Sequence, residues 1–158
     1  MISIIACVGK NRELGLNGDL VFRFKEDMKF FKKTTMGHPV LMGLNTFRSL
    51  PKALPGRTNY VLTSPPEELP ERVVPVSDLN KFLNEHKDEH IFIIGGAYVY
   101  AETIDLVDEL YLTEVDAGTE ADVFFPEFDK TKYDRIELGK GEEYGLKFTF
   151  AKYVKKII

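Results

Sequence analysis

The chain has 158 residues, of which 44% are hydrophobic and 29% charged, and its formal net charge at pH 7 is −4. This length and balance predict one globular domain, residues 1–158, that buries well over half of the surface of its unfolded chain. An acidic chain is a poor partner for the polyanionic backbone of nucleic acids. No apolar run approaches the roughly 20 residues of a membrane helix, so neither nucleic acid nor membrane is an expected partner.

The N-terminal segment, the single cysteine and the three histidines indicate the cellular compartment and whether a metal site is expected. The first residues, 1–8, lack a basic leader and are predicted to form a strand rather than a signal peptide. A single cysteine, Cys7, excludes an internal disulfide and favours the reducing cytoplasm. His38, His86 and His90 do not cluster with Cys7 in the sequence, so no metal site is predicted. His86 and His90 are expected to be solvated side chains at the charged end of a surface helix.

The predicted elements alternate between strands and helices. In chain order they are a strand at 2–8, a Gly/Asn-rich loop at 9–19, a helix within 24–33, a strand at 39–42, a helix at 45–50, strands at 58–63 and 73–76, a helix at 79–85 begun by Ser77 or Asp78, a strand at 91–94, a helix at 99–104, a strand at 109–115, a long loop, and antiparallel strands at 133–138 and 147–154. This order predicts an α/β fold: a single domain with a mostly parallel central sheet, flanking helices and a C-terminal antiparallel hairpin. One compact domain predicts a monomer.

Asp27 is an acidic residue at a position where the helical spacing predicts an apolar one. Positions 24, 27, 28 and 31 form the inward stripe, so the carboxyl of Asp27 is predicted to lie among Phe24, Met28 and Phe31. An inward carboxylate needs a hydrogen-bonding partner, a raised pKa or both, which are the conditions for a catalytic acid. Alternatively, Asp27 pairs with a basic residue or caps a backbone group, or a strained helix phase turns it toward solvent.

Glycines and small hydroxyls gather where the predicted strands end. Ligands of parallel sheets bind beyond these carboxyl ends, here Val8, 42–43, 63–64 and 94–96. The helix that begins after Gly43 and the one after Gly96 each offer free amides to an anion. The alternative is that Gly95-Gly96 only breaks the strand. The spacing fits neither the G-x-G-x-x-G fingerprint nor a P-loop.

Several segments match one family in order and spacing. They are 2–8, 15–20, 27–32, 39–43 with Thr46 and Phe47, 54–59, 94–96 with Val99 and Tyr100, 112–113, and Asp122 with Phe125 and Pro126. Through them the chain resembles the dihydrofolate reductases from its first strand to its last. The resemblance implies reduction of 7,8-dihydrofolate to tetrahydrofolate by a hydride from the nicotinamide of NADPH, which supplies one-carbon and thymidylate metabolism.

The resemblance implies a role for each matching residue of the substrate site. Asp27 matches the acid of the pterin pocket, and Thr113 matches the hydroxyl that hydrogen-bonds to it. Arg57 matches the arginine that clamps the glutamate tail, with Lys32 and Lys52 as helpers, although surface arginines are common. The matching apolar walls are Ile5, Met28, Phe31, Leu50, Leu54 and Ile94, with Tyr100 nearby.

The cofactor site and its lid follow from the same resemblance. The residues implied for the cofactor are Cys7, Leu14, Gly15, Asp19, Leu20, Gly43, Asn45, Thr46, Thr63, Ser64, Ile94, Gly95, Gly96, Ala97, Tyr98, Val99 and Tyr100. The loop 15–20 is implied to act as a lid that excludes water, with Leu20 and Phe22 beside the reacting rings. Asp122 is either a lid partner or a turn acid. A cis peptide is expected between Gly95 and Gly96, and Cys7 is expected to be a buried, unreactive thiol.

The chain departs from the family at two places. Val21-Phe22 replaces Pro-Trp, so the indole N–H that usually holds a water beside the pterin is absent. Leu44 and Tyr98 replace two arginines that usually bind cofactor phosphates, which leaves Thr63, Ser64 and Arg48 as candidates. NADPH is the expected cofactor, and NADH use is the alternative. Two rival functions are a pyrimidine-type reductase of the riboflavin pathway and a non-catalytic pterin- or nucleotide-binding protein.

Overall fold

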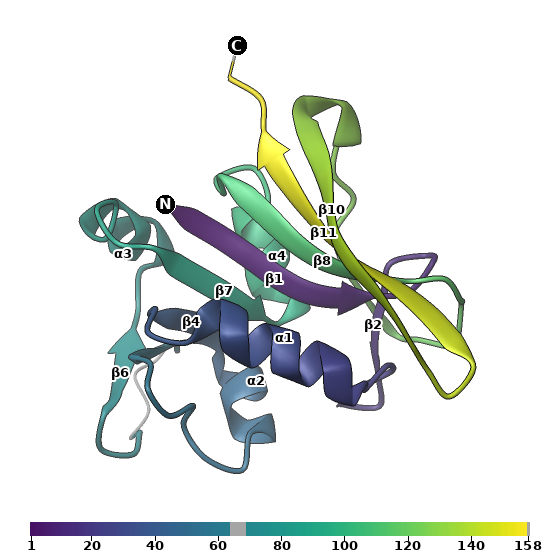
Figure 1. Ribbon diagram of the computed structural model, residues 1–158. Helices are drawn as coiled ribbons and strands as arrows, with labels where there is room; N and C mark the ends of the chain where they lie inside the picture. The colour runs from purple at the N-terminus through teal and green to yellow at the C-terminus, as the bar shows by residue number, and fades with distance from the viewer. Residues whose placement is uncertain (64–68, 158) are drawn as a thin grey trace.

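A computed structural model describes residues 1–63 and 69–157, and its core is a sheet of eight strands (Figure 1). In order across the sheet they are β10 (Tyr133–Glu143), β11 (Leu146–Lys155), β8 (Glu109–Val115), β1 (Ile2–Val8), β7 (Ile91–Gly95), β4 (Val40–Gly43), β5 (Asn59–Leu62) and β6 (Val73–Val76). The six strands from β8 to β6 pair in parallel, and β11 and β10 add an antiparallel edge. The predicted fold class is confirmed.

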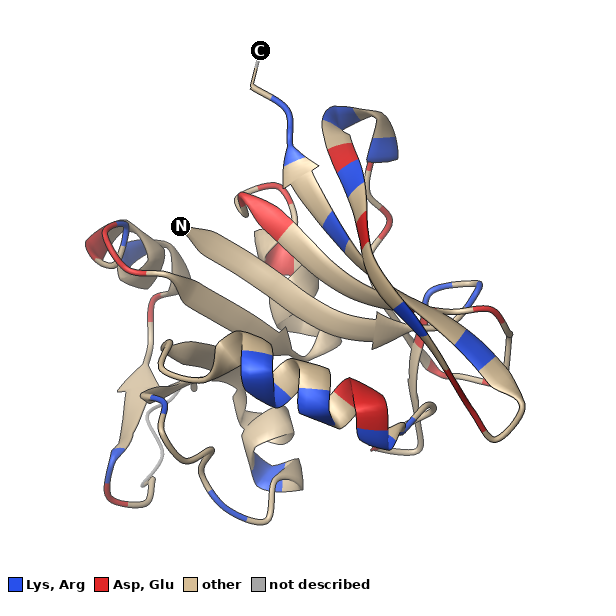
Figure 2. Cartoon of the chain, viewed as in Figure 1, with Lys and Arg blue, Asp and Glu red and all other residues tan. Residues whose placement is uncertain are grey.

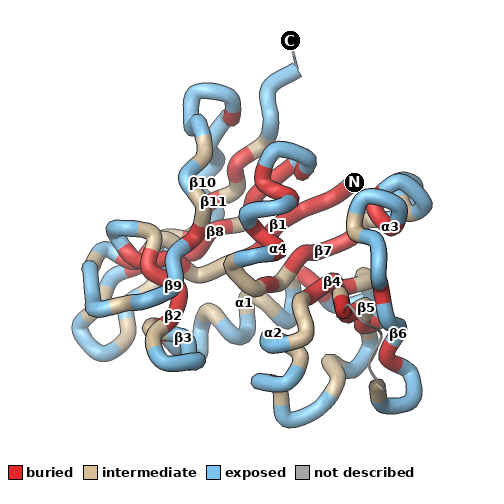
Figure 3. Tube along the Cα trace, turned by 180° about the vertical axis from the view of Figure 1, so that it is seen from behind, coloured by how far each residue is buried: buried red, intermediate tan, exposed pale blue. Residues whose placement is uncertain are grey.

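The central strands are apolar because both of their faces are covered. β1, β7 and β4 contain no charged residue, so the middle of the sheet is tan in Figure 2. Ile4, Leu41 and Ile93 are fully buried, and buried residues follow the same strands in Figure 3. Continuous apolar runs of this kind are typical of parallel strands that lie between two layers of helices.

Helices lie on both faces of the sheet. α1 (Lys25–Thr35) crosses one face, where Phe30 and Phe31 pack against Phe92 and its neighbours. α4 (Ala97–Thr103) covers the other face with Val99 and Tyr100. α2 (Leu44–Ser49) follows β4, and α3 (Leu79–Glu85) follows β6. Asp78 begins α3 by accepting a hydrogen bond from the Lys81 amide at 3.1 Å, as one of the two predicted caps.

A second, small antiparallel sheet lies in segments that were predicted to be loops. β2 (Glu13–Leu16) pairs with β3 (Asp19–Leu20) on one side and with β9 (Val123–Phe124) on the other. Asn17 and Gly18 connect β2 to β3 with φ values of 51° and 84°, the geometry of a two-residue hairpin turn. The Asn-Gly pair is a hairpin signal, but such short strands carry no periodicity, so the loop prediction was wrong here.

The C-terminal hairpin is longer than predicted. β10 continues five residues beyond Leu138 to Glu143, and Tyr144 and Gly145 turn the chain with φ values of 55° and 75°. A register shift between Glu137 and Gly139 interrupts the pairing. This bulge and the glycines of 139–141 hide the alternating pattern from a reading of the sequence. Because the hairpin is longer than predicted, its tip reaches the start of α1. The shorter predicted hairpin would not extend that far.

Two of the predicted solvated residues have protein partners instead. His86 lies against Phe82 and Tyr60, and its ring hydrogen-bonds to Glu89. His90 Nε2 lies 2.8 Å from the hydroxyl of Ser3. The prediction was wrong because α3 ends at Glu85, so the two histidines do not share a helix face. Among the described residues, no three His, Cys, Asp or Glu side chains gather as metal ligands, and no helix is long and apolar enough to cross a membrane.

Candidate active site

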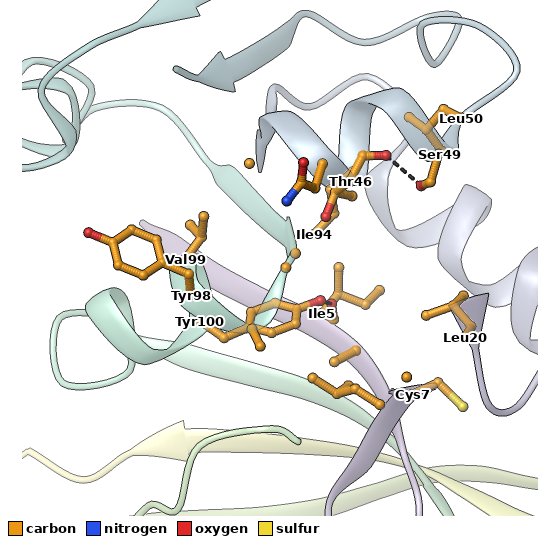
Figure 4. A pocket seen from close by; sticks show the side chains of 18 of the residues that line it. Ile5, Cys7, Leu20, Thr46, Ser49, Leu50, Ile94, Tyr98, Val99 and Tyr100 are labelled. Atoms are coloured by element: carbon orange, nitrogen blue, oxygen red, sulfur yellow. Dashed lines mark hydrogen bonds between the residues drawn. The ribbon is translucent and has the colours of Figure 1, made fainter. Parts of the chain in front are cut away.

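One large cleft, with a volume of about 1660 Å³, opens at the carboxyl ends of the parallel strands. It runs between α1, the β2–β3 hairpin and the starts of α2 and α4. In Figure 4, Leu20 of this hairpin lies across the cleft from Ile5 and Cys7 of β1. The lining residues that the sequence predicted are Ile5, Cys7, Leu14, Gly15, Asp19, Leu20, Phe22, Asp27, Met28, Phe31, Lys32, Gly43, Asn45, Thr46, Leu50, Leu54, Arg57, Thr63, Ile94, Gly95, Gly96, Ala97, Tyr98, Val99 and Tyr100.

Asp27 lies in the first turn of α1 and points at the sheet. Thr113 Oγ1 of β8 donates a hydrogen bond of 2.5 Å to Asp27 Oδ1, as predicted. The Cys7 thiol of β1 is a second partner, because the parallel pairing of β1 and β8 sets Cys7 beside Thr113. Burial raises the pKa of Asp27, Thr113 and Cys7 oppose this rise, and the charge of Glu143 adds to it. The carboxyl therefore keeps its proton to a higher pH than an exposed aspartic acid does.

The thiol of Cys7 is unsuited to nucleophilic chemistry. Burial raises its pKa far above the ordinary value, and the neighbouring Asp27 carboxyl raises it further. Tyr100 supports the same wall of the cleft, since its buried hydroxyl donates a 2.8 Å hydrogen bond to the carbonyl of Ile5. These contacts make Cys7 and Tyr100 parts of the wall that holds Asp27, rather than reactive groups.

The inward stripe of α1 differs from the prediction at one position. Phe24 is buried and Phe31 is partly buried, but Met28 is 63% exposed. Phe30 takes the packing place instead, with its ring stacked 4.4 Å from that of Phe150. The helix phase therefore points Asp27 inward and leaves Met28 at the rim of the cleft, where it still lines the opening.

Arg57 lies at the rim with its guanidinium held by the protein. Its Nε donates to the Pro55 carbonyl at 2.9 Å, and its Nη1 donates to Thr35 Oγ1 at 3.0 Å. Thr35 is itself fixed by a 2.8 Å hydrogen bond to the Phe31 carbonyl. These bonds use two of the five guanidinium donors. Lys32 also lines the cleft, whereas Lys52, predicted as a helper, is exposed and is not among the lining residues.

Glycine leaves the backbone bare at the end of β7. A Cβ built on Gly95 would lie 3.2 Å from Thr46 Oγ1, and one on Gly96 would lie 3.1 Å from the same atom. Gly95 also has a φ of 138°, a conformation that side chains rarely allow. The peptide between the two glycines is cis, as expected. Thr46 faces this bare backbone in Figure 4, and neither α2 nor α4 has a side-chain cap at its first turn.

The lid hairpin is tied to the loop that carries Asp122. Asp122 Oδ2 accepts a hydrogen bond from the Asn17 amide at 3.1 Å, and the Asp122 amide donates to the Gly15 carbonyl at 2.9 Å. Asp122 is therefore a partner of the lid and not only a turn acid. Sequence reasoning missed Glu13, which is 1% exposed and accepts from the amides of Asn11 at 2.6 Å and Thr119 at 2.8 Å.

The far end of the cleft is polar and acidic. Ser77, Asp78 and Asn80 line it where β6 ends, beside Thr63 at the end of β5. None of these three was predicted as a site residue, because ligands were expected only at the ends of four other strands. The basic lining residues, Arg23, Lys29, Lys32 and Arg57, all lie in or near α1 or in the loop that follows Pro55. Residues 64–68, which include the predicted Ser64, lie outside the described part of the chain and contain no Lys or Arg.

Comparison with known proteins agrees with this geometry. The family model for dihydrofolate reductase matches residues 1–155. The dihydrofolate reductase of Bacillus subtilis (strain 168) is 36% identical over 160 residues, which cover 99% of this chain and 95% of the relative. That of Neisseria gonorrhoeae is 36% identical over 98% of both chains. The dihydrofolate reductase HdrB of Haloferax volcanii is 34% identical over 97% of this chain and 82% of its own. The chain belongs to the dihydrofolate reductase family, oxidoreductases that reduce dihydrofolate to tetrahydrofolate with a nicotinamide cofactor.

Proposed function

We propose that this enzyme reduces 7,8-dihydrofolate to 5,6,7,8-tetrahydrofolate with NADPH and that Asp27 assists protonation of the pterin. The observation that carries the proposal is the inward carboxyl of Asp27, bonded to Thr113 at the base of an apolar cleft. The test follows the near-ultraviolet absorbance of reduced nicotinamide when purified protein, dihydrofolate and NADPH are mixed. A loss of absorbance that requires dihydrofolate is expected, whereas a non-catalytic binding protein would cause none.

The cleft suits a nicotinamide cofactor, which supplies the hydride when it is bound. The bare backbone of Gly95 and Gly96 beside Thr46 allows a flat ring or a phosphate to approach without meeting a Cβ. Ile5, Leu14 and Ile94 supply apolar surface on the same side. The protein's own task is to align two rings and to exclude water, and Leu20 of the lid hairpin faces this region.

Asp27 has the properties of a proton source for the substrate ring. A carboxyl at this depth can hold the guanidine-like edge of a pterin through paired hydrogen bonds. Because burial raises its pKa, Asp27 remains protonated into a range where an exposed aspartic acid is already ionised. Thr113 fixes the orientation of the carboxyl, since its hydroxyl donates to Oδ1.

Replacing Phe22 by Trp is expected to raise kcat/KM at neutral pH by about threefold to tenfold, or to move the pH optimum upward. Phe22 is 8% exposed and lines the cleft, but its ring carries no donor that could hold a water. An indole N–H would add one hydrogen bond in the proton path, worth roughly 0.5–1.5 kcal/mol. The pH profiles of the two enzymes decide this prediction. Superimposable profiles would remove the missing indole from the mechanism.

Replacing Leu44 by Arg is expected to raise the ratio of kcat/KM with NADPH to kcat/KM with NADH by about tenfold. The described residues at the far end of the cleft include Asp78 and no Lys or Arg, so selection for a cofactor phosphate is weak there. Steady-state assays with both cofactors measure the ratio. Leu44→Gln is the matched control, because a neutral side chain should leave the ratio near that of the parent. An equal ratio in the Arg variant would place the phosphate elsewhere.

The cellular location and the oligomeric state are proposed from composition and chain length alone. Cys7 is unpaired, in keeping with a reducing compartment, and a cytoplasmic location stays a prediction. A monomer is likewise proposed from the size of the domain, and the elution volume of the purified protein on a calibrated sizing column tests it.

A further inference from the structure

Glu143 joins the C-terminal hairpin to the helix that carries Asp27. It ends β10 at the tip of the C-terminal hairpin, and both of its carboxylate oxygens contact the start of α1. The Lys25 amide donates to Oε1 at 3.0 Å, and the Glu26 amide donates to Oε2 at 2.9 Å. Phe24, the residue that precedes the helix, provides no side-chain cap. Glu143 therefore caps α1 from 118 residues away along the chain.

The packing around the hairpin tip holds this cap in place. The ring of Phe148 on β11 stacks 4.5 Å from that of Phe24. Gly141 lies so close to α1 that a Cβ there would come within 2.5 Å of Glu26 Oε2 and 2.4 Å of the Phe148 ring. Figure 1 shows the hairpin tip beside the first turn of the helix. The length of β10 and the turn at 144–145 therefore deliver a carboxylate to the turn that contains Asp27.

We propose that Glu143 is a positioning residue for Asp27: its carboxylate fixes the first turn of α1 and offsets the positive end of the helix in front of the Asp27 carboxyl. This inference rests on the proposed role of Asp27 in catalysis. Two consequences follow for the wild-type enzyme. The bond from Thr113 to Asp27 keeps its geometry because the helix start cannot shift, and Asp27 ionises less readily because a negative charge satisfies the helix amides.

The groups that face Asp27 define the expected direction of the effect. They are the Cys7 thiol of β1, the Thr113 hydroxyl of β8, the Tyr100 hydroxyl of α4 and the Glu143 carboxylate of β10. On α1 itself, Lys25 and Glu26 precede Asp27 in the first turn. Burial is the main cause of the raised pKa of Asp27, and the Glu143 charge raises this pKa further. Loss of that charge removes a negative neighbour of Asp27 and leaves the positive end of the helix without an opposing charge. Both changes lower the pKa of Asp27.

The deciding experiment compares the pH profiles of the parent and of Glu143→Gln. An amide oxygen accepts one of the two backbone bonds but carries no charge. The limb on which kcat/KM falls with rising pH is expected to move to lower pH by roughly half a unit, and kcat/KM at neutral pH to fall about threefold. Glu142→Gln is the matched control, because its exposed side chain points to the other face of the strand. Glu143→Asp keeps the charge and should keep most of the parent profile.

A second measurement separates this inference from the proposed function. NMR titration of the Asp27 carboxyl carbon reports its ionisation whether or not the enzyme turns over dihydrofolate. A lower midpoint in Glu143→Gln, with Glu142→Gln unchanged, supports the positioning role even if the assay shows no reductase activity. If Glu143→Gln lowers only the temperature of unfolding and leaves both the titration and the pH profile unchanged, Glu143 is a structural cap and the proposal fails. Should that variant not fold, Glu143→Asp is expected to fold, and a shifted midpoint there overturns the proposal.

Discussion

Replacing Asp27 by Asn is expected to lower kcat/KM for dihydrofolate at neutral pH by about 10²- to 10⁴-fold, the usual range for a lost general acid. The asparagine keeps the size of the side chain and an oxygen that accepts the hydrogen bond from Thr113, so the fold and the cleft are expected to stay intact. It has no proton to give at any ordinary pH. Steady-state kinetics with dihydrofolate measure the loss, and Glu142→Gln, an exposed residue of β10, is the control.

The same substitution is expected to stabilise the protein at neutral pH. Because the folded-state pKa of Asp27 lies above its unfolded value, the folded protein binds this proton more tightly than the unfolded chain does. The ionised carboxyl therefore destabilises the fold above the folded-state pKa, and this destabilisation disappears as the pH falls through it. Asn removes it at every pH, which should raise the temperature of unfolding at pH 7 and raise it less at low pH.

Activity and stability together give a sharp test of the raised pKa. The parent is expected to lose kcat/KM as the pH rises through the pKa of Asp27, and the asparagine variant to show a flat profile over the same range. If the variant kept near-normal rates at neutral pH, Asp27 would have no part in the chemistry. If it were inactive but less stable than the parent, the carboxyl would be a structural group that the fold needs in its charged form.

The parallel core could be predicted from the sequence because most of its strands are runs rich in apolar residues, bounded by glycine or polar residues. The predicted runs 2–8, 73–76 and 109–115 match their strands residue for residue. Burial on both faces explains the nearly continuous apolar run of the central strand at 2–8. β2, β3 and β9 could not be predicted in this way. None of the three contains three consecutive apolar residues, and pairing with another segment, rather than local pattern, makes them strands.

The residues proposed for the site could be predicted one by one, but two contacts around Asp27 could not. The inward direction of Asp27 follows from helical spacing, and the family resemblance supplied Thr113 as its partner. The contact of Cys7 with Asp27 depends on the register of β1 against β8, which no local pattern encodes. The cap from Glu143 depends on the length of a hairpin whose alternating pattern is broken by a bulge. These two contacts, each between segments far apart in sequence, were therefore supplied only by the structure.

Replacing Arg57 by Gln is expected to raise the KM for dihydrofolate by roughly 30- to 100-fold and to change kcat little. Nε and Nη1 are committed to Pro55 and Thr35, which holds the plane of the guanidinium at the rim of the cleft. The three remaining N–H donors can meet the two oxygens of one carboxylate, as the glutamate tail of the substrate provides. Losing hydrogen bonds to a charged group costs about 2–3 kcal/mol, and every 1.4 kcal/mol is about tenfold in affinity.

The effect should fall on KM because the tail lies away from the reacting ring, so its binding energy is the same before and in the transition state. Arg57→Lys is expected to recover only part of the affinity, since a lysine keeps the charge but cannot make the paired bonds or reach Pro55 and Thr35 together. Lys52→Gln is the control, because Lys52 is exposed and does not line the cleft. An equal rise in KM for Lys52→Gln would mean that general positive charge, and not the fixed guanidinium, attracts the substrate. A fall in kcat with KM unchanged would place Arg57 in the chemistry of the ring, contrary to its position at the rim.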